Sequence, residues 1–167
     1  MSAGTETTYF AGGCFWGVEH ILKSQNGVID TDVGYIGGQT ENPIYQDVCT
    51  GETGHAEAVS VVFDPSVVSF YELCDLFFRL HDPTTLNQQG PDQGTQYRSA
   101  IFCTNSNQIK TANDLISELT AISAFPDPIM TEVKEAGRYW PAEDLHQDYF
   151  DRNSGHLCHV LRPPFLR

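Results

Sequence analysis

One cysteine flanked by glycines and aromatic residues is the part of this sequence best suited to chemistry. Cys14 lies in the segment Gly12–Gly17 (GGCFWG), directly after a strand-like run of residues. If a helix begins here, its unpaired amide N–H groups favour the thiolate, which is the nucleophilic form of cysteine. The glycines let a substrate approach the backbone, and Phe15 and Trp16 can form an apolar wall beside the sulfur. We therefore predict attack on a small substrate with an apolar end; a buried structural cysteine is the poorer interpretation.

Glu57 is the candidate proton donor. It begins a strand-like segment in which alternate residues share a face, so it lies in one row with Val59, Val61 and Phe63. A carboxyl group at the end of an apolar row is partly desolvated, which raises its pKa and suits it to general acid catalysis. The same pattern fits a Glu57 that points into solvent where the strand begins. The residues by themselves favour neither alternative.

Two tyrosines and an aspartate lie in loop-like segments. Tyr45 follows an Asn-Pro-Ile turn, and Asp92 and Tyr97 lie within residues 90–98 (GPDQGTQYR). A tyrosine hydroxyl can donate a hydrogen bond to a developing oxyanion. For each tyrosine taken singly, aromatic packing at a loop edge is the better explanation.

Cys158 lies in a tail with little periodicity that begins near residue 152. A tail thiol can reach a distant sulfur without disturbing the core, so Cys158 is interpreted as a resolving thiol for an oxidised Cys14. The alternative is zinc binding through His156, Cys158 and His159, although neither their spacing nor their number matches a structural zinc site.

The other cysteines and histidines carry weaker signals. Cys74 lies on an apolar helical stripe and Cys103 ends a predicted strand, so both are interpreted as structural. Cys49 is also interpreted as structural, although its neighbouring residues favour that interpretation less. Four scattered histidines are interpreted as structural or as loop hydrogen-bonding residues: His20, His55, His81 and His146.

Strand-like and helix-like segments alternate along the 167 residues, without a repeat or a linker. We predict a single α/β domain over residues 1–167, a two-layer sandwich with a mixed β-sheet, long loops and a flexible tail over about 152–167. Strands are expected over 7–10, 28–35, 57–63, 99–103 and 130–136. Helices are expected after Cys14, at 70–77, from residue 105 or 106 to 119, and from Pro141 through Phe150. Residues 81–95 form a long loop.

The net charge argues against some classes of binding partner. The formal net charge is −13, which argues against nucleic acid and anionic membranes. No apolar stretch approaches the ~20 residues that a membrane helix needs. No signal peptide is visible, and an odd number of cysteines without CxxC spacing fits reduced thiols in a cytoplasm. The small size and acidic surface favour a monomer.

Together these motifs resemble the methionine sulfoxide reductase A family. The resemblance covers nearly the whole chain and keeps the order of the motifs. The shared segments are Gly13–Gly17, Gly34–Gly38, Asn42–Tyr45, Thr53–Val59, His81–Pro83, Asp92–Ile101 and Ala142–Gln147.

The resemblance implies reduction of methionine-S-sulfoxide, free or in proteins, to methionine. It implies that Cys14 is the nucleophile and that Phe15 and Trp16 hold the substrate methyl group. Glu57 would protonate the sulfoxide oxygen, which favours the buried alternative for this residue. Tyr45 and Tyr97 would hydrogen-bond to that oxygen, and Asp92 would hold the polar end of the methionine.

The resemblance also implies the catalytic cycle. Cys14 becomes a sulfenic acid, which condenses with the Cys158 thiol to a disulfide. Thioredoxin then reduces the disulfide by thiol exchange, and neither a metal nor an organic cofactor is needed. Many relatives carry a further recycling cysteine in a glycine-rich tail. Here no cysteine follows Cys158, so thioredoxin must meet the Cys14–Cys158 bond directly unless Cys49 takes part.

Two other functions share some of these features. A thiol peroxidase would also form a sulfenic acid at Cys14, but its peroxide substrate does not explain the Phe15-Trp16 wall. A zinc-binding or redox-sensing module would use the cysteine and histidines of the tail instead. Comparison of peroxide with methionine sulfoxide as oxidant, and metal analysis of the purified protein, distinguish these functions.

Overall fold

A mixed six-stranded β-sheet organises the computed structural model, which describes residues 4–153 and 159–167. The strand order is β7-β6-β1-β3-β2-β8, and every neighbouring pair is antiparallel except β6 and β7. These strands are β1 (Glu6–Gly12), β2 (Val28–Ile36), β3 (Ala56–Phe63), β6 (Ser99–Cys103), β7 (Glu132–Glu135) and β8 (Tyr139–Pro141). The predicted mixed sheet in an α/β fold is confirmed.

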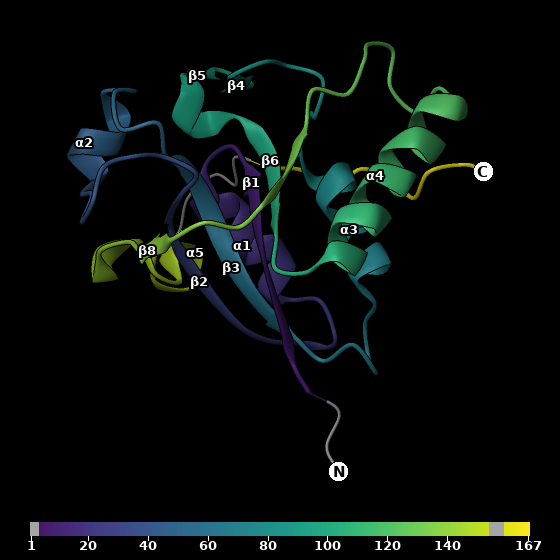
Figure 1. Cartoon of the computed structure of the whole chain (residues 1–167), viewed down its shortest axis with the longest axis horizontal. Helices are drawn as coiled ribbons and strands as arrows, with labels where there is room; N and C mark the ends of the chain where they lie inside the picture. The colour runs from purple at the N-terminus through teal and green to yellow at the C-terminus, as the bar shows by residue number, and fades with distance from the viewer. Residues whose placement is uncertain (1–3, 154–158) are drawn as a thin grey trace.

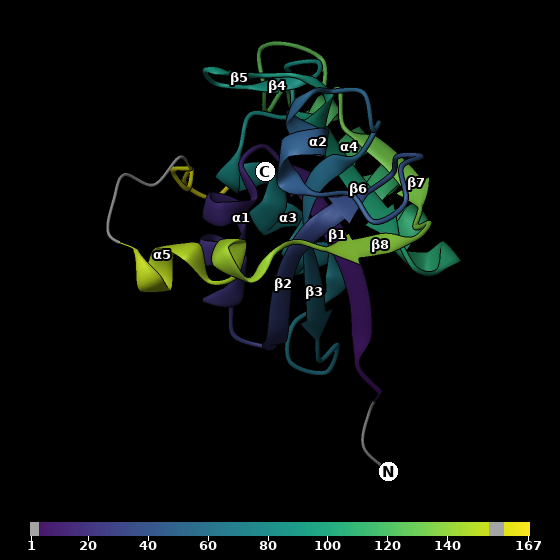
Figure 2. The same cartoon turned by 90° about the vertical axis from the view of Figure 1, so that its left-hand side faces the viewer.

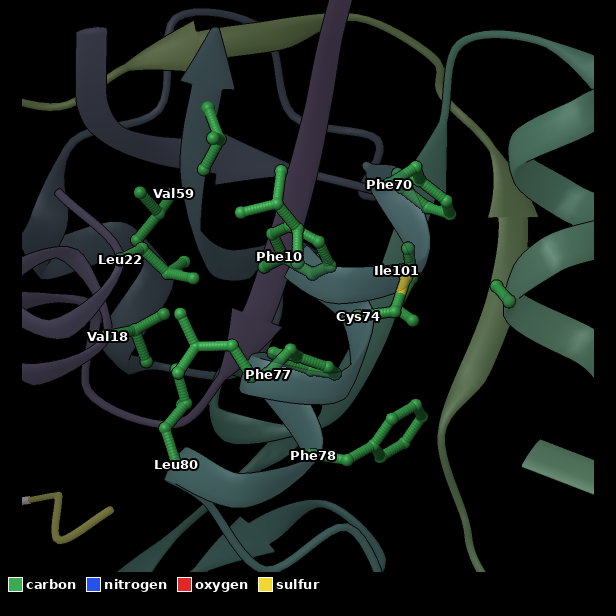
Figure 3. Packing of buried hydrophobic residues seen from close by; sticks show 14 of the residues in the cluster. Phe10, Val18, Leu22, Val59, Phe70, Cys74, Phe77, Phe78, Leu80 and Ile101 are labelled. Atoms are coloured by element: carbon green, nitrogen blue, oxygen red, sulfur yellow. The ribbon is translucent and has the colours of Figure 1, made fainter. Parts of the chain in front are cut away.

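Three helices pack together against this sheet (Figures 1 and 2): α1 (Phe15–Lys23), α3 (Phe70–Leu80) and α4 (Ser106–Ala121). Apolar residues recur on one side of α3, while alternate residues of β3 point toward the helices, so both elements bury one face. Figure 3 shows the resulting core, in which Phe10 of β1 and Val59 of β3 lie near Phe77 of α3. The phenyl rings of Phe10 and Phe77 stack with their centroids 5.0 Å apart.

The sheet is curled because its two edge strands are close in sequence. Only residues 136–138 separate β7 from β8, although these strands form opposite edges. Four Cα–Cα steps span at most ~15 Å, whereas five interstrand spacings in a flat sheet amount to ~24 Å. The connection passes over the face opposite the helices (Figure 1), where Ala136 and Tyr139 pack against a smaller apolar cluster.

Most predicted elements are present with shifted ends, but the helix expected from Pro141 through Phe150 is wrong. Pro141 instead ends β8, where it pairs with Gly34 of β2. Pairing at a sheet edge suits proline because its missing N–H can face away from the ladder. A 3₁₀ turn, η2 (Asp144–His146), and a short helix, α5 (Tyr149–Arg152), follow. Asp148 between them has a φ of 52°, which interrupts a continuous helix.

The remaining elements are short and lie in the loops that surround the N-terminal end of α1. They are α2 (Tyr45–Cys49), β4 (Gln88–Gln89), β5 (Asp92–Gln93) and the 3₁₀ turn η1 (Thr95–Tyr97). The predicted loop over 81–95 therefore contains a two-stranded ribbon, β4 with β5.

The tail expected to be flexible makes specific contacts over residues 159–167. The backbone N–H of Arg162 donates to the carbonyl of Arg79 on α3 at 2.8 Å. Arg167 at the end of the chain forms ion pairs with Asp75 of α3 and Glu118 of α4, each at 2.6 Å. Within the described ranges, the structure contains no helix long and apolar enough to cross a membrane.

Candidate active site

Cys14 occupies the position where β1 passes into α1. Gly13 turns the chain with a φ of 96°, a conformation that side chains disfavour, and Cys14 is then the N-cap of the helix. Its side chain is partly exposed. The predicted position at a helix start is thus confirmed, and the first-turn amides of α1 carry the partial positive charge that favours a thiolate.

Glu57 lies next to the nucleophile although it is far away in sequence. It projects from β3 toward the helices and only 1% of its surface is exposed. One carboxylate oxygen, Oε1, accepts a hydrogen bond of 3.3 Å from the backbone N–H of Phe15. The side chain is therefore buried, not solvated, and the strand pattern is resolved in favour of the row with Val59, Val61 and Phe63.

Tyr45 and Tyr97 approach the same carboxyl group from two separate segments of the chain. Tyr45 is the first residue of α2 and not a loop residue as expected, whereas Tyr97 ends η1. Burial raises the pKa of both hydroxyls, and the negative charge of Glu57 raises each further, that of Tyr97 to about 12. Both hydroxyls consequently keep their protons near neutral pH and can donate hydrogen bonds. Asp92 in β5 and Cys14 add to the same effect on Tyr97.

The two aromatic residues after Cys14 differ in their surroundings. Phe15 is 1% exposed and packs against Tyr35 and Tyr45, with ring centroids 5.8 Å and 6.4 Å away. Trp16 is partly exposed and stacks on Tyr149 of α5 with centroids 3.8 Å apart and ring planes 6° from parallel. Neighbouring aromatic groups therefore hold both rings in place at the start of α1, directly after Cys14.

His146 and Glu143, which the sequence patterns did not single out as functional, hold the aromatic residues around the start of α1 through hydrogen bonds. His146 is buried, and its Nδ1 accepts a 3.0 Å hydrogen bond from the indole N–H of Trp16. Glu143 accepts from the Tyr35 hydroxyl and from the backbone N–H of Tyr45. Both lie in residues 142–147 (AEDLHQ), a segment that only the family resemblance marks. The signal that could have found them is a run of polar residues between an edge strand and a short helix.

Burial and hydrogen bonding adjust the charges of these two groups. Burial lowers the pKa of His146 and keeps the imidazole neutral, with the Glu143 charge opposing this effect. For Glu143, burial raises the pKa, but the hydrogen bonds from Tyr45 and Tyr35 outweigh it and the pKa lies below its ordinary value. A neutral imidazole beside a carboxylate is the pair that these hydrogen bonds require.

The other described cysteines differ in burial, and two of the three alternative zinc ligands lie outside the described residues. Cys74 and Cys103 are buried in the core, as predicted, and burial raises the pKa of Cys103 to about 11, whereas Cys49 is exposed. Cys158 and His156 lie outside the described residues. Among the residues that the structure describes, no group of three or more His, Cys, Asp or Glu side chains is placed to hold a metal ion.

Comparison with known proteins identifies the family of this chain. A family model described as "Peptide methionine sulfoxide reductase" matches residues 6–166. A peptide methionine sulfoxide reductase MsrA of Methanothermobacter thermautotrophicus is 48% identical over 157 residues, which are 94% of this chain and 93% of the relative. The chain belongs to the peptide methionine sulfoxide reductase family. It is an oxidoreductase of that family, and the resemblance found in the motifs is confirmed.

Solved structures of similar proteins share the fold. The reduced form of Mxr1 from Saccharomyces cerevisiae has a TM-score of 0.90 and 37% identity, covering 96% of this chain and 94% of that chain. Mxr1 has also been crystallised in complex with Trx2; that structure has a TM-score of 0.66 and 25% identity, covering 96% of this chain and 92% of that chain.

His146→Phe should raise the KM of this reductase for a sulfoxide substrate about fivefold, the effect of losing roughly 1 kcal/mol from one hydrogen bond, with a smaller change in kcat. Phenylalanine keeps the aromatic contacts but cannot accept the Trp16 N–H. In the parent, KM should stay constant above about pH 6.5, the ordinary pKa of histidine. It should rise only at lower pH, because burial lowers the pKa of His146 and protonated Nδ1 cannot accept. Steady-state kinetics from pH 5 to 8 measure both effects. An unchanged KM in His146→Phe would contradict this role of His146. The control is His20→Phe, because His20 lies on the same helix as Trp16.

Proposed function

We propose that this chain reduces methionine-S-sulfoxide, free or within proteins, through a sulfenic acid at Cys14. The observation that carries this proposal is the hydrogen bond from Phe15 N–H to Oε1 of the buried Glu57. It fixes a carboxyl group at the residue next to a cysteine that caps a helix. A thiolate and a proton donor are thereby available at one place, as transfer of a sulfoxide oxygen requires.

The reductase step follows from these two groups. The Cys14 thiolate attacks the sulfoxide sulfur while Glu57 gives its proton to the sulfoxide oxygen. The oxygen is transferred to the cysteine, methionine leaves, and Cys14 becomes a sulfenic acid, so the substrate sulfur is reduced by two electrons and the Cys14 sulfur is oxidised by two. Tyr45 and Tyr97 support the same step, because their protonated hydroxyls can donate to the oxygen as its negative charge increases.

Substrate recognition is assigned to three further groups. Phe15 and Trp16 form the apolar surroundings of the S-methyl group; Trp16 is the partly exposed ring of the two, and its contacts with Tyr149 and His146 fix its orientation. Asp92 lies close enough to Tyr97 for its charge to act on that hydroxyl. A carboxylate at this edge of the site suits the amino group, or the backbone N–H, of the methionine.

The cycle closes through a second thiol. The Cys14 sulfenic acid condenses with the thiol of Cys158, releasing water and forming a disulfide. Thioredoxin then reduces this disulfide by exchange with its own thiols. The crystal structure of the yeast relative Mxr1 with Trx2 supports this choice of reductant. We further propose a monomer of one domain over residues 1–167 that repairs oxidised proteins in the cytoplasm during oxidative stress.

A single-turnover experiment tests the proposal. Fully reduced protein is mixed with the S- or the R-sulfoxide of N-acetylmethionine, and the N-acetylmethionine formed, the thiols lost and the disulfide position are measured. With the S-epimer only, we expect one N-acetylmethionine formed and two thiols lost per chain, with a Cys14–Cys158 link. If neither epimer gives N-acetylmethionine while hydrogen peroxide consumes the thiols, the chain is a peroxidase and the proposal is wrong.

Cys158→Ser isolates the resolving step. This variant should still form one methionine in a single turnover but should lose only one thiol, and its steady-state turnover with thioredoxin should fall to background. Steady-state rates with thioredoxin, compared with those of Cys49→Ser, give the measurement. Turnover of Cys158→Ser at the rate of the parent would refute the resolving role, and a loss of turnover in Cys49→Ser would assign that role to Cys49.

A further inference from the structure

A buried histidine from the C-terminal segment lies against the turn that carries Cys14. His159 is 4% exposed, and its Nε2 lies 2.7 Å from the carbonyl oxygen of Gly12. Because a carbonyl only accepts hydrogen bonds, Nε2 carries the proton and donates. The other ring nitrogen, Nδ1, is buried without a hydrogen-bond partner among the residues that the structure describes. The ring is therefore held by one polar contact and by the shape of its surroundings.

Glycines make the space for this ring. A Cβ atom added to Gly17 would lie 2.3 Å from Nδ1 of His159, and one added to Gly13 would lie 3.3 Å from Nε2. The first distance is shorter than any real contact of a Cβ atom, so only glycine at position 17 leaves room for the imidazole. We call the space bounded by Gly12, Gly13 and Gly17 the histidine slot. Cys14 belongs to the same short segment, so the slot and the nucleophile are built from one stretch of chain.

The residues after His159 are fixed as well. Arg162 and Arg79 of α3 form two hydrogen bonds, from Arg162 N–H to the Arg79 carbonyl at 2.8 Å and from Arg79 Nε to the Arg162 carbonyl at 2.9 Å. The Arg162 guanidinium also donates to the carbonyl of His81. Within residues 159–167, His159 therefore contacts the turn that carries Cys14, whereas Arg162 and Arg167 anchor the segment along α3.

We propose that His159 is a positioning residue for the resolving thiol, and that its insertion into the histidine slot keeps the thiol of Cys158 within reach of Cys14. This inference rests on the proposed function, in which Cys158 closes the disulfide. Consecutive Cα atoms are ~3.8 Å apart, so an anchor at His159 limits how far the preceding residue can move from the slot. A tether of this kind raises the effective concentration of one thiol at the other sulfur without a new contact between them.

The test separates the two chemical steps in a single turnover. In His159→Ala, methionine formation should keep the rate of the parent, while loss of the second thiol should slow ~10-fold as the tether is released. His159→Gln should recover part of that rate, because its amide N–H can donate to the Gly12 carbonyl. Arg167→Ala is the matched control, since it removes the far anchor of the same segment and should leave both rates unchanged.

The glycine at position 17 gives an independent variant. Gly17→Ala should expel the imidazole and slow loss of the second thiol as His159→Ala does. The double variant should be no slower than either single variant, because the two substitutions remove one contact. Additive effects, or an unchanged rate in His159→Ala while Cys158→Ser loses only one thiol, would overturn the proposal. Loss of two thiols in Cys158→Ser would overturn the resolving role and this inference with it.

Discussion

Cys14→Ser should reduce methionine formation by at least ~10³-fold, to the background rate, because loss of a nucleophile removes the covalent pathway entirely. A serine hydroxyl in this place is not ionised near neutral pH. It cannot attack the sulfoxide sulfur and cannot accept its oxygen as a sulfenic acid does. The fold should persist, since serine is among the preferred N-cap residues and Cys14 is the N-cap of α1. Methionine release in a single turnover, measured by chromatography, gives the result.

The matched control is Cys103→Ala. Cys103 is buried in the core, and burial raises its pKa to about 11, so its thiol stays protonated and unreactive. This variant should keep the methionine yield of the parent, at a cost in stability on the order of 1 kcal/mol for the lost sulfur. A Cys14→Ser protein that still forms methionine would exclude Cys14 as the nucleophile, whatever the behaviour of the control.

Glu57→Gln should slow the reductase step by ~10²-fold or more, the range expected for loss of a general acid. The substitution is conservative in shape. A glutamine oxygen can still accept from the Phe15 N–H, as Oε1 of Glu57 does at 3.3 Å, so the packing beside Cys14 is kept. What is lost is the transferable proton. Rapid-mixing measurement of methionine formation should show the slower rate.

Glu19→Gln provides the comparison for Glu57. Glu19 is also 1% exposed, lies on α1 and accepts hydrogen bonds from Thr31 and from the backbone of Asp148, away from the thiol. A general effect of replacing a buried carboxyl group would slow both variants, whereas proton transfer requires Glu57 specifically. Equal rates in Glu57→Gln and the parent at neutral pH would rule out its acid role.

Features that depend on residues close in sequence were predictable. Strand-like residues followed by glycines and an apolar helical stripe place Cys14 at the start of α1, because period and capping are local properties. Alternation in β3 assigned Glu57 to one of two faces but could not choose between burial and solvent. A two-residue period defines a face and contains no information about what covers it. The family motifs favoured the buried alternative before the structure showed it.

Only the tertiary structure brought together residues from distant segments. Phe15 and Glu57 are 42 residues apart, and Trp16 and His146 are 130 apart. The helix expected over 141–150 failed for the same reason, since pairing of Pro141 with the edge of β2 outweighed a local preference. The burial of His159 against Gly12, 147 residues away, has no local signal at all. The sequence determined the chemical groups and their local conformations, whereas packing of α1 and the C-terminal segment around the curled sheet decided which groups meet.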